Sequence, residues 1–235
     1  MATPVKQYTT ILFDLDHTLW DYEKNSLESL QQLHSKYDLY GYGGITFTSF
    51  LSTFQKVNRG LWDSYNKKII DRAYIKEHRF RRILESFEID NSSVAQKLSV
   101  EYIELCPQKT HLMPYALDAL NYLSSKYKLF LLTNGFDDVQ TIKLNTSKIS
   151  NFFDGMVTSE TCGHRKPATE IFEYTLEQAQ SKAEKAIMIG DNLMADIRGA
   201  RNASLDTVFY NPLKSRHKEP TTYEIDCLSQ LTNIL

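Results

Sequence analysis

Short apolar runs that alternate with helix-like stretches are the feature that most constrains this chain of 235 residues. A run that is apolar throughout, rather than at every second position, is typical of a strand buried on both faces of a parallel sheet. Strand, helix and strand in repetition predict a doubly wound, Rossmann-like α/β sheet. The runs that we interpret as strands are Thr10–Phe13, Leu129–Leu132, Gly155–Thr158, Ala186–Ile189 and Thr207–Tyr210.

One long interval, residues 22–106, interrupts this alternation and contains no strand-like run. Apolar residues from Phe47 to Leu61 recur every three or four positions, which predicts an amphipathic helix. The glycines of Tyr40–Gly44 predict a loop. We therefore expect an all-helical cap domain at 22–106, inserted into a Rossmann-like core formed by residues 1–21 and 107–235.

The balance of charge and hydrophobicity excludes several classes of protein. Hydrophobic residues make up 42% and charged residues 24%, which is typical of a folded globular chain. Lys plus Arg number 27 against 29 Asp plus Glu, so the net charge of −2 gives no basis for binding a nucleic acid polymer. The apolar runs fall far short of the ~20 residues that span a membrane. We expect a cytoplasmic protein with no membrane partner, as a monomer or weak homodimer.

Polar residues follow three of the predicted strands directly. Asp14 and Asp16 follow the first, Thr133 and Asn134 the second, and Asp191 the fourth. The carboxyl ends of parallel strands line the ligand crevice of such a sheet. Carboxylates brought together there require a cation or a shared proton, and oxygen ligands suit Mg²⁺. The sequence therefore predicts a magnesium site at this edge.

Each residue taken singly also has an ordinary structural explanation. An Asp-x-Asp pair at a strand end is often a turn or a helix cap, and Asp191 is placed to cap a helix starting near Asn192. Asp196 is placed to pair with a nearby arginine, and Lys166 has the character of a surface lysine. Their joint order along the chain favours the functional interpretation.

Four segments, in this order, resemble the motifs of the haloacid dehalogenase-like (HAD) hydrolase superfamily. Phe13–Leu19 resembles its DxDxT motif, Leu132–Gly135 its second motif, Arg165–Pro167 the segment of its motif lysine, and Gly190–Asp196 its GDxxxxD motif. The helical insert is similar to the type-1 cap of that superfamily. At finer grain, Asp16–Asp21 and the GDxxxxD form resemble the bacterial 5′-nucleotidase branch.

This resemblance implies a role for each of the acidic residues. Asp14 is the expected nucleophile, forming a phosphoaspartyl intermediate, and Asp16 the expected general acid and base. We expect Asp16 to be neutral when substrate binds, with its proton held by proximity to Asp14. Mg²⁺ is the expected cofactor, held by the Asp14 carboxylate, the Asp16 backbone carbonyl and Asp191. Asp196 is expected outside the metal's own ligands, where it orients bound water or Lys166.

The remaining implied site residues contact the phosphoryl group. Lys166 and Thr133 are expected catalytic residues that also bind substrate, together with Asn134. Trp20 and Tyr22 lie where the chain leaves the core, so two roles are open for them. They can stack on a flat group such as a nucleobase, or they can pack between the cap and the core.

The expected function is Mg²⁺-dependent hydrolysis of a small phosphate monoester, with nucleoside 5′-monophosphates as the first choice of substrate. Hydrolysis or phosphoryl transfer on a sugar phosphate is an alternative. Dehalogenation of a 2-haloacid is disfavoured by Asp16, since that branch lacks a second motif aspartate. Phosphonoacetaldehyde hydrolysis requires a cap lysine, and several are present. Outside enzymes, the alternatives are a signalling receiver domain, which has about half this length, and an inactive scaffold.

Overall fold

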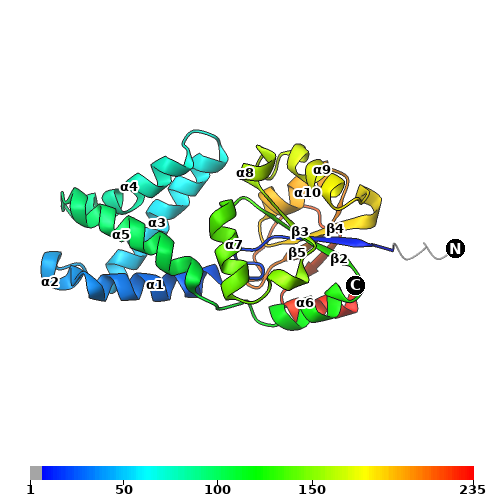
Figure 1. The fold of residues 1–235 in the computed structure, drawn as a ribbon, viewed down its shortest axis with the longest axis horizontal. Helices are drawn as coiled ribbons and strands as arrows, with labels where there is room; N and C mark the ends of the chain where they lie inside the picture. The colour runs from blue at the N-terminus through cyan, green and yellow to red at the C-terminus, as the bar shows by residue number, and fades with distance from the viewer. Residues whose placement is uncertain (1–6) are drawn as a thin grey trace. The chain divides into compact units, whose positions relative to one another are not determined.

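Six parallel strands form the sheet of the computed structural model, which describes residues 7–235 (Figure 1). The predicted strands are all present, so the doubly wound α/β class is confirmed. The strands are β1 (Thr10–Phe13), β2 (Lys128–Thr133), β3 (Gly155–Thr158), β4 (Ala186–Gly190), β5 (Asp206–Tyr210) and β6 (Tyr223–Ile225).

The strand order, β3-β2-β1-β4-β5-β6, places β1 between β2 and β4. After β3 the chain returns to the other side of β1, and the order of the strands reverses at that point. Ligands of open α/β sheets bind at such a reversal, beside the carboxyl ends of the strands. The topology therefore predicts a ligand site at the residues that follow β1 and β4.

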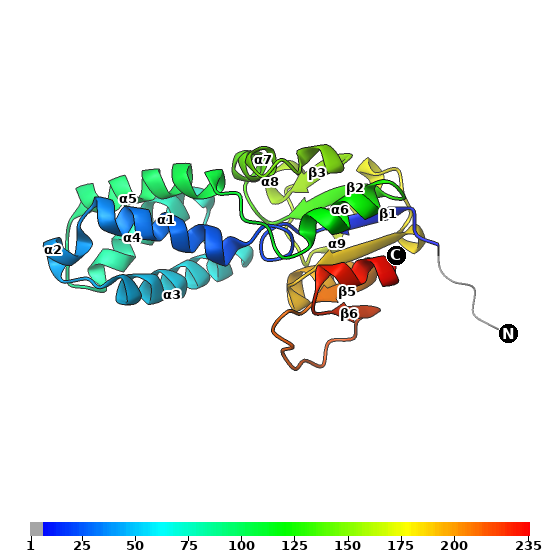
Figure 2. The same cartoon turned by 90° about the horizontal axis from the view of Figure 1, so that it is seen from below.

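Helices cover both faces of the sheet. Successive strand residues point to opposite faces, so the apolar strands present buried side chains on both of them. Leu12, Leu132 and Met188 share one buried cluster with Phe172 of α9 (Thr169–Gln178). On the other face, α6 (Ala116–Ser124) lies beside the C-terminal helical turns (Leu228–Asn233), as Figure 2 shows. The other α-helices of this unit are α7 (Asp137–Thr146), α8 (Ser159–Cys162) and α10 (Gly199–Asn202).

Strand β6 was not predicted because it has no apolar run. Tyr223 and Glu224 are exposed and only Ile225 is buried. The strand lies at the edge of the sheet and pairs with β5 alone. Backbone pairing rather than side-chain burial therefore defines it, and its residue types carry little signal.

The chain divides into two compact units. One contains the chain up to Tyr22 together with Thr110–Leu235, and the other is Glu23–Lys109. The sequence-based boundaries were 21/22 and 106/107. The first unit contains the sheet. The second contains α3, α4 and α5 entirely, together with α2 and nearly all of α1, whose first residue, Tyr22, belongs to the first unit.

Side-chain caps begin three of the long helices of the helical unit, α3, α4 and α5. Thr46, Asp71 and Asn91 each accept a hydrogen bond from a backbone N–H three residues later. Aromatic side chains fill the interior, and the ring centres of Phe54 and Tyr102 are 5.1 Å apart. The helices are α1 (Tyr22–Lys36), α2 (Leu39–Gly43), α3 (Phe47–Asn66), α4 (Arg72–Glu85) and α5 (Ser92–Leu105).

The loop predicted at Tyr40–Gly44 is wrong, because most of it belongs to the short helix α2. The Asp38 side chain accepts a hydrogen bond from the backbone N–H of Gly41 at 3.2 Å and begins the helix despite its glycines. Gly44, with φ of 65°, ends it in the left-handed region. Across residues 7–235, no helix combines the length and the apolar character needed to cross a membrane.

Candidate active site

Three carboxyl groups meet at the carboxyl ends of β1 and β4; those of Asp14 and Asp196 are buried and that of Asp191 is half-buried. Oxygen atoms of Asp14, Asp191 and Asp196 all lie within 4.8 Å of one another. Asp14 follows β1 directly, and Asp191 follows β4 directly. Asp196 lies on the helical turn Leu193–Arg198, one element further along the chain. The strand order thus assembles an acidic cluster from segments more than 170 residues apart in sequence.

Lys166 provides a buried positive charge to this cluster. Its Nζ donates hydrogen bonds to Asp14 Oδ1 at 2.6 Å, to Asp196 Oδ1 at 2.6 Å and to the Leu132 carbonyl at 2.7 Å. Burial alone would lower the pKa of Lys166, but the two carboxylates outweigh burial and raise it. Lys166 is therefore a charged ammonium group. It supplies one positive charge to a cluster of three carboxyl groups, those of Asp14, Asp191 and Asp196.

The pKa values of the carboxyl groups show this excess of negative charge. Burial raises the pKa of Asp14 to about 7; Lys166 opposes that rise, and Asp196 adds to it. Burial also raises the pKa of Asp191 well above its usual range, with Asp14 and Asp196 contributing. Thr18 donates a hydrogen bond to Asp191 Oδ1 at 3.2 Å. A hard divalent cation would satisfy these oxygens, so the donor set fits Mg²⁺.

The spacing between Gly190 and Asp196 has a simple geometric basis. Asn192 caps the turn that follows β4, and its backbone N–H donates to Asp196 Oδ2 at 2.9 Å. The chain thus brings Asp196 back against β4. A Cβ atom on Gly190 would lie 2.3 Å from Asp196 Oδ2, so only glycine fits there. Asp196, expected to orient Lys166, contacts Lys166 and also lies within the acidic cluster itself.

Asp16 has a different environment from the one expected. Its Oδ1 accepts a hydrogen bond from Lys143 Nζ at 2.6 Å and its Oδ2 one from Gln140 Nε2 at 2.9 Å. Burial alone would raise the pKa of Asp16, but these two donors outweigh burial and lower it. In the free protein Asp16 is therefore held in its ionised form, and the raised pKa belongs to Asp14. The expectation that Asp16 is neutral concerns the complex with substrate and stays a prediction.

Thr133 and Asn134 occupy the end of β2, beside Lys166. Thr133 Oγ1 accepts hydrogen bonds from the Gly135 N–H at 3.0 Å and from Gln140 Nε2 at 2.8 Å, so its own proton can be donated elsewhere. The Asn134 side chain forms a reciprocal pair with the Lys166 backbone, at 2.8 and 3.0 Å. Asn134 thus positions the segment that carries Lys166.

Sequence reasoning missed Gln140 and Lys143 as site residues. Both lie on one face of α7, the helix that follows β2, at the i and i+3 spacing that brings side chains together. That spacing is visible in the sequence, but nothing local shows that this face points toward Asp16. Trp20 is completely buried, and Lys143 Nζ lies 4.4 Å from its ring centre. Trp20 thus packs against Lys143 and Tyr22 within the sheet-containing unit, and packing between the two units stays a prediction.

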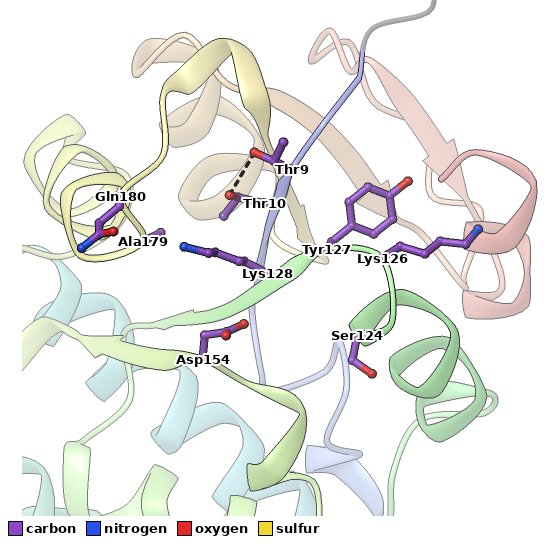
Figure 3. A pocket seen from close by; sticks show the side chains of 9 residues that line it. All are labelled: Thr9, Thr10, Ser124, Lys126, Tyr127, Lys128, Asp154, Ala179 and Gln180. Carbon is purple, nitrogen blue, oxygen red and sulfur yellow. Dashed lines mark hydrogen bonds between the residues drawn. The ribbon is translucent and has the colours of Figure 1, made fainter.

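A separate polar hollow of about 470 Å³ lies at the amino ends of the strands, opposite the ends that carry the acidic cluster (Figure 3). Thr9, Thr10 and Lys128 line it at the amino ends of β1 and β2, with Asp154 before β3. The Asp154 side chain accepts a hydrogen bond from the Leu129 N–H at 3.0 Å. None of the predicted site residues lines this hollow, so it is distinct from the acidic cluster.

Comparison with known proteins gives consistent matches. A family model described as haloacid dehalogenase-like hydrolase matches residues 11–210. The pyrimidine 5′-nucleotidase PynA of Streptococcus pneumoniae is 33% identical, with 97% of each chain covered. The pyrimidine 5′-nucleotidase YjjG of Escherichia coli is 29% identical, with 96% of each chain covered.

A solved structure also resembles this chain over nearly its whole length. The crystal structure of the HAD-hydrolase YfnB of Bacillus subtilis, bound to magnesium, has a TM-score of 0.87 at 30% identity. The match covers 97% of this chain and 99% of that one. The similarity therefore extends over both compact units.

Proposed function

Because this chain belongs to the haloacid dehalogenase-like hydrolase family, we propose that it is a Mg²⁺-dependent phosphomonoesterase acting on nucleoside 5′-monophosphates. The observation that carries the proposal is the meeting of Asp14, Asp191, Asp196 and Lys166 at one edge of the sheet. The two pyrimidine 5′-nucleotidases among the relatives support the substrate class. Pyrimidine nucleotides are therefore the first compounds to test.

Asp14 acts as the nucleophile in the first half of the proposed reaction. One of its carboxylate oxygens attacks phosphorus, and the bond from phosphorus to the ester oxygen of the nucleoside breaks. The departing oxygen takes a proton from Asp16. Lys143 favours the ionised form of Asp16 in the free protein, whereas the negative charge of an incoming phosphate favours protonation. The covalent step replaces one difficult displacement by two easier ones.

Water completes the reaction in the second half. Its oxygen attacks the phosphorus of the phosphoaspartyl group, its proton passes to Asp16, and the bond between phosphorus and Asp14 breaks. Inorganic phosphate leaves and the carboxylate of Asp14 is restored. Asp16 is protonated again, as in the complex with substrate, and releases that proton to solvent once phosphate has left. Asp16 thus serves as acid in one half and as base in the other.

The other residues of the site bind charge and fix positions. Lys166 and the Thr133 hydroxyl are placed to neutralise and hydrogen-bond the phosphoryl oxygens. The Asp14 and Asp191 carboxylates, with the Asp16 backbone carbonyl, would hold Mg²⁺, and Asp196 would hold Lys166 in place. When bound, the metal reduces the repulsion between the Asp14 carboxylate and the phosphate.

The chemistry is tested by phosphate release from p-nitrophenyl phosphate. We expect release to require Mg²⁺, to stop in EDTA, and to fall to background in Asp14→Asn, which keeps the shape of the side chain but removes its charge. Circular dichroism of the variant should match that of the wild type. Full activity in EDTA would contradict the role of the metal.

The substrate class is tested with a panel of phosphate esters and one haloacid. We expect dCMP, dTMP, UMP or AMP to be hydrolysed with higher kcat/KM than hexose phosphates, and 2-chloropropionate to be inert. Turnover of a hexose phosphate while all four nucleotides remain inert would replace the nucleotide assignment by a sugar phosphate. Such a result would leave the proposed roles of Asp14 and Asp16 intact.

A further inference from the structure

Lys143 is a buried lysine that takes no part in either bond-breaking step of the proposed reaction. Its side chain is only 7% exposed, on α7 between β2 and β3. An ammonium group that is removed from water loses much of its solvation, and the fold tolerates this only where other groups replace the lost contacts. The groups around Lys143 therefore indicate what it is there to do.

Two groups hold the ammonium of Lys143, and both come from the segment that follows β1. Asp16 Oδ1 accepts its hydrogen bond at 2.6 Å. The ring of Trp20 has its centre 4.4 Å from Nζ, within the range of a cation–π contact. Trp20 is completely buried, so this ring is itself fixed by its surroundings. The ammonium thus has one defined position rather than the freedom of a surface lysine.

Gln140, one turn earlier on α7, holds the second oxygen of the same carboxylate. Its Nε2 donates to Asp16 Oδ2 at 2.9 Å and to Thr133 Oγ1 at 2.8 Å. Gly135 leaves room for this side chain, since a Cβ atom there would lie 2.3 Å from Gln140 Nε2. One donor on each oxygen fixes the rotation of a carboxylate as well as its position.

We propose that Lys143, together with Gln140, is a positioning residue that fixes the direction in which Asp16 presents its carboxyl group to the leaving oxygen. The inference rests on the proposed role of Asp16 as proton donor. Without Lys143, the carboxyl group of Asp16 is held by Gln140 alone and samples other rotamers. The step that suffers is the one in which the leaving oxygen needs a proton.

The nature of the leaving group separates this role from a general structural one. The alkoxide of a nucleoside is strongly basic and needs a proton as its bond to phosphorus breaks, whereas p-nitrophenolate is weakly basic and leaves without one. The ratio kcat/KM reports only the steps up to formation of the phosphoenzyme. We expect Lys143→Met to lower kcat/KM for an alkyl phosphate, such as UMP, roughly tenfold or more beyond its effect on p-nitrophenyl phosphate.

Two further variants complete the experiment. Lys148→Met removes an exposed lysine just after α7 and should leave kcat/KM unchanged for both UMP and p-nitrophenyl phosphate. Lys143→Gln keeps a hydrogen-bond donor at the buried position, so it should fold if Lys143→Met does not. It should also lower kcat/KM more for UMP than for p-nitrophenyl phosphate, but by a smaller factor than Lys143→Met.

An equal loss on both substrates, or no loss, in the folded Lys143 variants would overturn the inference. Failure of the proposed function gives a different result, since the wild type would then hydrolyse no alkyl phosphate with a requirement for Asp14. If the natural substrate proves to be a sugar phosphate, the same comparison is made with that ester, because its leaving group is also an alkoxide.

Discussion

Lys166 and its two carboxylate partners, Asp14 and Asp196, form a buried group of charges at this site. The side chain of Lys166 is 2% exposed and that of Asp196 is 1% exposed, with 2.6 Å between Nζ and Oδ1. A buried ion pair gains from the low local dielectric only when every lost water contact is replaced, and Nζ has three acceptors here. The pKa of Asp14 is raised to about 7, so its protonation state changes near neutral pH.

Binding of Mg²⁺ should depend on pH because the metal competes with a proton at Asp14. Its pKa is raised from 3.8 to about 7, so between these values the folded protein holds a proton that the unfolded chain has released. This group therefore favours the folded state at low pH, and its contribution is lost as pH rises through 7. Below about pH 7, we expect the apparent affinity for Mg²⁺ to increase with pH, because binding must release that proton.

Calorimetry in two buffers of different ionisation enthalpy measures the protons released. We expect more release at about pH 6 than at about pH 8, and less of it in Asp14→Asn. The same number of protons at both pH values would contradict a competition at Asp14. Asp191, whose pKa is also raised, should release protons as well, so Asp14→Asn should reduce the release without abolishing it. Asp16 should contribute little, since its pKa is lowered rather than raised.

At the scale of the elements, two glycines differ in the space that surrounds them. Gly135 follows β2, where a Cβ atom would lie 2.3 Å from Gln140 Nε2 and 2.5 Å from Gln140 Cδ. Gly60 lies inside α3, where an added Cβ would meet no atom within 4 Å. The first position is constrained by a close approach between two elements, and the second is not.

Alanine at these two glycines should therefore change stability in opposite directions. Gly135→Ala displaces Gln140 and should lower the free energy of unfolding by about 1–3 kcal/mol. Gly60→Ala should raise it by about 0.5–1 kcal/mol, because alanine restricts the unfolded chain and favours the helix. Urea unfolding followed by circular dichroism measures both. A Gly135→Ala protein as stable as the wild type would show that Gln140 is not held as described.

At the scale of the whole molecule, exposed large apolar side chains occur in both units. Tyr40, Tyr42 and Ile69 are exposed in the helical unit, and Leu117 and Leu213 in the unit with the sheet. Stable self-association usually buries one contiguous apolar patch. The monomer or weak homodimer expected from the sequence stays a prediction.

Light scattering after size-exclusion chromatography tests the state of the whole chain. We expect the mass of one chain at low micromolar concentration, in the presence and in the absence of Mg²⁺. A mass of two chains that persists on dilution would contradict the expectation and would point to an interface formed by some of these side chains.

Local sequence determined the elements whose residues carry their own signal. The runs Thr10–Phe13 and Ala186–Ile189 could be predicted as strands because strand residues that are buried on both faces of a sheet are mostly apolar. Asp14 and Asp191 follow these strands directly, so the rule for strand ends places them at one edge as soon as the sheet is parallel. Where the signal is backbone pairing or a capped turn, as in Tyr223–Ile225 and Leu39–Gly43, residue types alone do not reveal the element.

Tertiary structure decided which groups the site residues face. Lys166 is 152 positions from Asp14, and only the folded sheet places its Nζ 2.6 Å from that carboxylate. The direction of the Asp16 carboxyl group depends on Lys143, 127 positions away, and no pattern around Asp16 indicates it. Hydrophobic periodicity follows from neighbours along the chain, whereas side-chain direction and pKa follow from neighbours in space. The sequence therefore predicted most of the residues that the fold brings together here, although not Gln140 or Lys143, and the fold determined their partners and their charge.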